Sequence, residues 1–438
     1  MSCTNIAFPL YSSPCRRGVM CGTLLIMLLL GLPLRLLAAN PLTLNEALAI
    51  AVQESSLLAA QRSAIAAAEA VTGSARELPD PKLKLGIDNL PLDGADRYSL
   101  TRDFMTMRRI GVAQEFTRGE KRELKGQRAE HQLAREQALL GDTRAGVRRD
   151  AATAWMELYY AGQMAKAVDA QYAETLLQRE ALQAGIAANR VTLAERITLE
   201  STMQMLLNRR TEFEKQAARA QAMLGRWLGN SAKRPLSAPP DTVAGMTADP
   251  PLATASGDPH APHHPHLLSL ERQIDIAQSE ADIAKAATKP DWGLEVSYAQ
   301  RGPGYSNMLT FQVSIDLPVF AERRQNREAA MRLAQVEQAR ALREDALRQH
   351  VAEAAAARAV WQSATQRLKR FDDTLLPLAR DNAAVALAAY RSGLSSLAAV
   401  LDARRMELDL RLQKLQLAAE QGRAYAQLIY FLPEEVVK

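Results

Sequence analysis

Two long stretches without proline constrain the fold of this chain more than any other feature of its sequence. Residues 118–186 contain no proline, and residues 321–390 contain one, Pro377. At a rise of 1.5 Å per residue, a continuous helix of roughly 70 residues would extend about 100 Å, which no ordinary globular domain requires. The sequence therefore predicts a mainly α-helical protein built on very long helices.

Helices of this length need partners along one face. The second stretch shows mostly apolar residues at alternating spacings of four and three, and the pattern resumes after residue 397. The positions are Phe371, Leu375, Leu378, Asn382, Val385 and Ala389, then Leu401, Leu408, Leu412, Leu415 and Ala419. A narrow apolar seam of this kind is typical of coiled coils. We expect long antiparallel coiled-coil helices.

Short segments that alternate apolar and polar residues lie between the helical stretches. In residues 82–88, Leu83, Leu85 and Ile87 share one face and polar residues the other, as in a two-faced strand. Residues 292–298 and 309–317 repeat the pattern, and residues 104–116 give a noisier example. The sequence thus predicts four strands.

The sequence contains two copies of one structural unit. Collinear matches shifted by about 200 to 211 residues indicate an internal duplication. They pair Leu57-Leu58 with Leu267-Leu268, Pro79-Asp80 with Pro290-Asp291, Glu115-Phe116 with Asp316-Leu317, Glu120-Lys121-Arg122 with Glu322-Arg323-Arg324, and Leu193 with Leu397. Each copy reads as helix, strand, strand, long helix, turn and helix, with the first helix expected over residues 43–78 and ended by Pro79.

The amino-terminal 39 residues differ from the rest. Arg16 and Arg17 precede an uncharged run over residues 19–34, and small residues precede Asn40, as in a secretory signal peptide. All three cysteines and three arginines, but no acidic residue, lie in this segment, so its removal would leave no cysteine and lower the net charge of +5. We expect four parts: a signal peptide at 1–39, a first repeat at 40–230, a linker rich in Pro and His at 231–264, and a second repeat at 265–438.

The alternating strands match the pattern of membrane barrels, in which one face meets lipid and the other a watery lumen. A half-buried soluble sheet is the alternative. Four strands cannot close a barrel, because the smallest known have eight, and an open edge is not tolerated in lipid. Strands that cross a membrane would therefore be shared among several chains.

The two repeats behind a signal peptide, with turns at 189–193 and 390–397, resemble the TolC family of outer-membrane efflux proteins over essentially the whole mature chain. The segments 80–81, 89–94, 103–107 and 114–116 further resemble its heavy-metal branch. The resemblance implies a homotrimer in which twelve strands form one barrel, continued by a helical periplasmic tunnel. It also implies a place in the outer membrane of a Gram-negative cell, and docking of an inner-membrane proton-driven pump and a periplasmic adaptor.

The resemblance also implies a gate at the periplasmic tip. In the second turn Gly393 and Asp402 match the family's glycine and acid, and Tyr390 matches a nearby tyrosine. In the first turn Glu195 matches an acidic position, while Asn189 replaces the glycine. Asp402 either lines a constriction or pairs with a nearby arginine.

Four of the six histidines gather in one proline-rich segment and are weak candidates for a metal contact, since imidazole binds Zn, Cu and Ni. They are His260, His263, His264 and His266. The prolines predict an extended linker, and no carboxylate partner is evident in the sequence, so we expect neither a metal site nor a cofactor. His131 and His350 stand singly on long helices, where a surface position is expected.

The sequence predicts no enzyme, because it contains no nucleophile elbow, no phosphate-binding glycine loop and no carboxylate pair on a rigid pocket. The prediction is a passive exit duct of a tripartite efflux system, carrying heavy-metal cations. The rival interpretation is a periplasmic adaptor or a coiled-coil spacer without channel activity. An adaptor would normally have one helical hairpin between β-rich modules, whereas this chain has two hairpins, each with its own strand pair.

Overall fold

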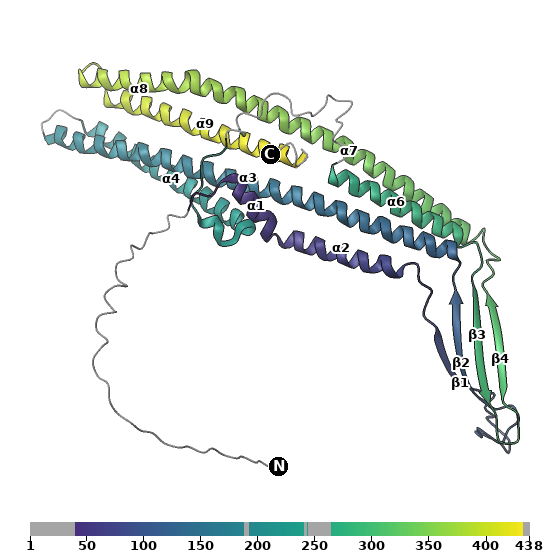
Figure 1. Ribbon diagram of the computed structural model, residues 1–438. Coiled ribbons are helices and arrows are strands. Elements are labelled where there is room, and N and C mark those ends of the chain that lie inside the picture. Colours follow the sequence, from purple (N-terminus) through teal and green to yellow (C-terminus); the bar gives the residue numbers. More distant parts are fainter. Residues whose placement is uncertain (1–39, 188–191, 241–242, 244–263, 432–438) are drawn as a thin grey trace, which may run out of the picture. The chain divides into compact units, whose positions relative to one another are not determined.

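The computed structural model describes residues 40–187, 192–240, 243 and 264–431. The expected signal peptide, the residues 189–191 of the first turn, His260 and His263 lie outside these ranges. Figure 1 shows the helices and strands of the described residues. Two helix–strand–strand–helix units follow one another, which confirms the predicted fold class.

Four α-helices are described in the first unit. They are α1 (Leu44–Glu54), α2 (Ser56–Ser74), α3 (Gly119–Ala187) and α4 (Leu193–Leu228), followed by the 3-10 turn η1 (Gly229–Lys233). The prediction of a single helix over residues 43–78 is wrong. Ser55 has extended backbone angles and its hydroxyl accepts a hydrogen bond from the Leu58 N–H, so this residue caps a second helix.

The second unit repeats this order with one irregularity. It comprises α6 (Pro265–Ala286), α7 (Gln325–Arg370), the π-helical turn η3 (Phe371–Leu375), α8 (Leu376–Arg391) and α9 (Leu397–Phe431). The π turn ends two residues before Pro377, and the Leu376 N–H bonds to the Phe371 carbonyl five residues back. A proline ring clashes with the carbonyl four residues earlier, and the wider turn accommodates it without ending the helical path.

The sheet is antiparallel, in the order β1-β2-β3-β4. Its strands are β1 (Lys82–Asp88), β2 (Met107–Phe116), β3 (Trp292–Gln300) and β4 (Met308–Ile315). The two hairpins belong to different copies of the repeat, and β2 and β3 join them.

The core runs along the central helix α3, which packs against α2, α4, α6 and α9, while α7 packs against α6 and α9. Its centre contains Trp155 and Met156, both completely buried, and small residues such as Ala151 and Ala426 let the helices approach closely. The Trp155 indole donates to the Leu42 carbonyl, so the polar atom of this ring is satisfied inside the core. Among the described residues, no helix is both long enough and apolar enough to cross a membrane.

Candidate functional site: the two-faced sheet and the helical turns

One face of the sheet is mainly apolar, and Arg108, Gln114 and Gln300 are its polar exceptions. The register places these apolar side chains together on it: Leu83, Leu85, Ile87, Ile110, Val112, Phe116, Trp292, Leu294, Val296, Tyr298, Leu309, Phe311, Val313 and Ile315. Many lie open to the surroundings, with exposed fractions of 71% for Leu85 and 68% for Phe311. A contiguous exposed apolar face of this size is unusual for a soluble surface and suits contact with lipid.

The opposite face carries charges that pair across the strands. Lys84 Nζ lies 2.5 Å from Glu295 Oε2, and Arg109 Nε lies 3.1 Å from Asp88 Oδ2. Lys82 Nζ similarly contacts Glu115 Oε1 at 2.5 Å. Because cationic and anionic side chains alternate here, this face suits water rather than lipid.

Glycines let the strands approach one another closely on the polar face. A Cβ atom added to Gly111 would lie 2.7 Å from the Ser297 Cβ, and one added to Gly293 would lie 2.7 Å from the Ser314 Oγ. At Gly86, on the outer strand β1, an added Cβ would meet nothing within 4 Å. The polar face is therefore tightly filled from β2 to β4 and open at β1.

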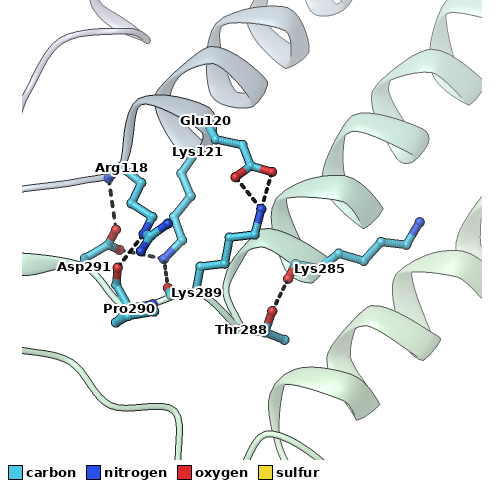
Figure 2. Close-up of polar contacts among 8 residues, drawn as sticks. All are labelled: Arg118, Glu120, Lys121, Lys285, Thr288, Lys289, Pro290 and Asp291. Atoms are coloured by element: carbon cyan, nitrogen blue, oxygen red, sulfur yellow. Dashed lines mark hydrogen bonds and ion pairs between the residues drawn. The ribbon is translucent and has the colours of Figure 1, made fainter.

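The junction between sheet and helices is held by one cluster of polar contacts (Figure 2). Asp291, directly before β3, accepts a hydrogen bond from the Arg118 N–H at 3.0 Å and forms an ion pair with Lys121 Nζ at 2.7 Å. Lys121 also donates to the Lys289 carbonyl, and Arg118 to the Pro290 carbonyl. Lys121 is only 9% exposed, so these bonds satisfy a nearly buried ammonium group. They tie the start of α3 to the start of β3.

The turn between α8 and α9 is built around Gly393. Its φ of +77° is a left-handed conformation that glycine adopts without strain. The Leu394 N–H bonds to the Ala389 carbonyl and the Gly393 N–H to the Tyr390 carbonyl, which is the Schellman pattern that ends helices. The glycine matched by resemblance to a gate motif therefore has a structural reason to be present.

Glu195 begins α4 and completes a capping box. Its carboxylate accepts the Thr192 N–H at 3.0 Å, and the Thr192 hydroxyl accepts the Glu195 N–H at 3.3 Å. The bond from the Thr192 N–H, opposed by burial and supported by the Thr192 hydroxyl and the Leu397 N–H, holds the pKa of Glu195 below its usual value. Glu195 is therefore negative at neutral pH and connects the beginnings of α4 and α9.

The turn residues of both hairpins meet in a small apolar cluster. It contains Leu182, Leu199, Leu397 and Leu401, with Tyr390 packed against it. Asp402 follows Leu401 and is exposed on α9. Arg404 pairs with Glu174 and Glu407, each at 2.8 Å, and Arg405 lies 3.9 Å from Asp409. In the described part of the chain Asp402 forms no ion pair, so these two arginines do not neutralise it.

Two of the four clustered histidines lie at the start of helix α6 rather than in a solvated linker, and His264 is buried there. His264 is 6% exposed and caps α6: its Nδ1 accepts the His266 N–H at 3.2 Å, and its Nε2 lies 2.9 Å from the Tyr430 carbonyl. With both ring nitrogens engaged, His264 has no lone pair for a metal. The described residues contain no group of three or more metal-ligating side chains.

A carboxylate partner that the sequence did not reveal lies on α3. Asp142 contacts His266 Nδ1 at 3.3 Å and accepts the Tyr430 hydroxyl at 2.8 Å. Burial works to raise the pKa of Asp142, but the bonds from His266 and Tyr430 lower it below its usual value. The bond to Asp142, opposed by burial, raises the pKa of His266. A sequence separation of more than a hundred residues concealed this contact.

The other two histidines have different surroundings. His350 is 5% exposed, and its ring lies 4.6 Å from that of His264 and 4.9 Å from that of Phe431. The expected surface position is therefore wrong, because α7 turns this face toward α6 and α9. His131 is partly exposed, with Nδ1 3.9 Å from Asp275.

Residues 261–432 match the sequence profile of the family described as outer membrane efflux protein. The second repeat is therefore similar in sequence to outer membrane efflux proteins. The description of this family agrees with the outer-membrane efflux role predicted from the sequence.

Solved structures of outer-membrane channels share the fold over most of the chain. The Campylobacter jejuni channel CmeC aligns with a TM-score of 0.74 at 12% identity, covering 89% of this chain and 85% of that one. VceC from Vibrio cholerae gives a TM-score of 0.71 at 18% identity, covering 89% and 95%, and CusC gives 0.72 at 15%, covering 88% and 90%. Among curated protein sequences none matches significantly.

Proposed function

We propose that this chain is an outer-membrane efflux channel, and that it works as a homotrimer whose twelve strands close one barrel. The observation that carries this is a four-stranded sheet with an exposed apolar face, a charged face and two free outer strands. Unpaired strand edges are costly in lipid, and three copies supply an even number of strands within the range of known barrels. The helices continue the duct into the periplasm.

The finer assignment is a passive exit for heavy-metal cations, delivered by an inner-membrane proton-driven pump through a periplasmic adaptor. The loop sequences around residues 80–81, 89–94 and 103–107 resemble those of the metal-exporting branch and support this assignment. Asp402 and Glu195 supply negative charge near the apolar cluster that joins the two turns. Repeated by threefold symmetry, such carboxylates would favour cations at the entrance.

The test combines mass and conductance. Detergent-solubilised protein should have the mass of three chains plus detergent, and reconstitution into planar bilayers should give stepwise ion conductance. A spacer or adaptor would stay soluble without detergent and give no conductance. A monomer that conducts would contradict the shared barrel but not the channel function.

A further inference from the structure

The two copies of the repeat pair corresponding residues within their hairpins. The sequence matches shift β1 to β3 by 211 residues, from Asp80 to Asp291, and β2 to β4 by 201 residues, from Phe116 to Leu317. These shifts carry Lys82 and Ala113, which face each other in the first hairpin, onto Gly293 and Ser314, which face each other in the second. The observed registers of both hairpins therefore agree with matches found in the sequence alone.

The contact between the copies has a counterpart that one chain cannot make. Strand β2 of the first copy pairs with β3 of the second, so that Ala113 faces Glu295 and Val112 faces Val296. Applied to these pairs, the same shifts give Ser314 facing Lys84 and Val313 facing Leu85, a pairing of β4 with β1. Those are the two outer strands of the sheet, and every residue of β4 is exposed.

The side chains of β1 and β4 are complementary in this register. Leu83, Leu85 and Ile87 would face Ile315, Val313 and Phe311, which extends the apolar face without interruption. Lys82 would face Asp316. Gln312 would face Gly86, where an added Cβ atom would meet nothing within 4 Å in the single chain. A slip by one residue would bring apolar residues against the polar face, so the hydrophobic pattern disfavours it.

The junction of Figure 2 has a counterpart as well. Asp80 corresponds to Asp291, and Arg323 to Lys121. Whereas Lys121 is nearly buried against Asp291, both Asp80 and Arg323 are exposed. Neither forms an ion pair within the described residues. The single chain thus leaves one acid and one base free at the places where the other copy of the repeat joins them.

We propose that β4 of one copy pairs with β1 of the next in the register Ser314 with Lys84 and Val313 with Leu85. An ion pair between Asp80 and Arg323 of neighbouring copies repeats the contact of Asp291 with Lys121. The inference rests on the proposed trimer and specifies its interface residue by residue. Its partner is a second copy of this chain.

Disulfide cross-linking tests the register. In a Cys3→Ser, Cys15→Ser, Cys21→Ser background, Lys84→Cys with Ser314→Cys should give, on oxidation, a reducible ladder of covalent dimers and trimers in denaturing gels. The control combines Lys84→Cys with Gln312→Cys, on the same face but two residues away. Such diagonal neighbours lie about 7–8 Å apart, beyond disulfide geometry, so the ladder should be lost.

Charge exchange tests the ion pair. Asp80→Arg and Arg323→Asp should each lower the temperature at which the trimer dissociates in detergent, and the double variant should recover most of the loss. Arg324→Asp, which alters the adjacent exposed arginine, is the matched control and should change the dissociation temperature less.

The outcomes separate the interface from the function. A conducting trimer that cross-links through the control pair, or through neither pair, overturns the register and leaves the proposed function intact. A double charge variant no more stable than the single ones overturns the ion pair. Absence of both a trimer and conductance refutes the proposed function itself.

Discussion

At the scale of single residues, the histidine cluster shows how context decides the role of a side chain. Sequence reasoning placed His264 in a solvated linker because prolines surround it, yet its ring lies between His350 and Tyr430. The proline at 265 is instead the first residue of a helix, where its missing N–H costs nothing. Burial lowers the pKa of His264, opposed by the Tyr430 carbonyl and Asp142.

The stability of the cluster should depend on pH through His264. Because its pKa is lower in the folded than in the unfolded chain, protonation favours unfolding as the pH falls through the ordinary histidine range. His264→Asn keeps a helix-capping side chain but removes this titration. We expect the melting temperature of the variant to fall less than that of the wild type between pH 8 and pH 5, measured by circular dichroism.

His266 provides the opposite control for that measurement. Its raised pKa means that its ion pair with Asp142 contributes stability at low pH, which is lost as the pH rises through the folded-state value. His266→Gln should therefore lower the melting temperature more at pH 5 than at pH 8. Equal pH slopes in wild type and both variants would show that these rings do not titrate differently on unfolding.

Asp402 and Glu195 are the candidate gate residues. Asp402→Ala together with Glu195→Gln should reduce the preference for cations and the block by trivalent cations in planar bilayers, since both carboxylates are lost. Glutamine preserves the capping box at Glu195, so helix α4 should begin normally. Unchanged selectivity in the double variant would remove both residues from the gate.

At the scale of elements, strands and long helices were predictable because their signals are local. The alternation of residues 82–88 predicts β1 with its observed bounds. The stretch without proline predicts both ends of α3 to within one residue. The break at Ser55 was missed because serine also occurs inside helices, and only the fold shows that its hydroxyl caps α2. The π turn before Pro377 was likewise not predictable, because a proline can either end a helix or be accommodated by a wider turn.

The sheet–helix junction should respond strongly to loss of its carboxylate. Asp291→Ala leaves the Lys121 ammonium nearly buried with only a carbonyl partner, at an expected cost of about 2 kcal/mol in unfolding free energy. Asp291→Asn keeps an acceptor for the Arg118 N–H and should cost less. Urea titrations followed by tryptophan fluorescence measure both, and equal stability of wild type and Asp291→Ala would contradict the role of this pair.

At the scale of the whole molecule, the sequence indicated the architecture through its duplication rather than through any catalytic motif. A passive duct needs little chemistry of its own, so its cargo leaves few marks in the sequence. We expect deletion of the gene to sensitise cells to salts of Cu, Ag, Zn, Cd or Co, with organic toxicants as the comparison. Sensitivity to organic toxicants alone would contradict the heavy-metal assignment.

The glycines between the strands have a consequence for curvature. When a sheet bends, side chains on the inner side converge while those on the outer side spread apart. Gly111 and Gly293 remove volume from the charged side alone, where an added Cβ atom would collide with a serine of the next strand. Bending toward the charged face therefore meets less steric resistance than it would with larger residues at these two positions. Water would fill the hollow, and the bulky Leu, Phe and Trp side chains would fan outward on the convex wall.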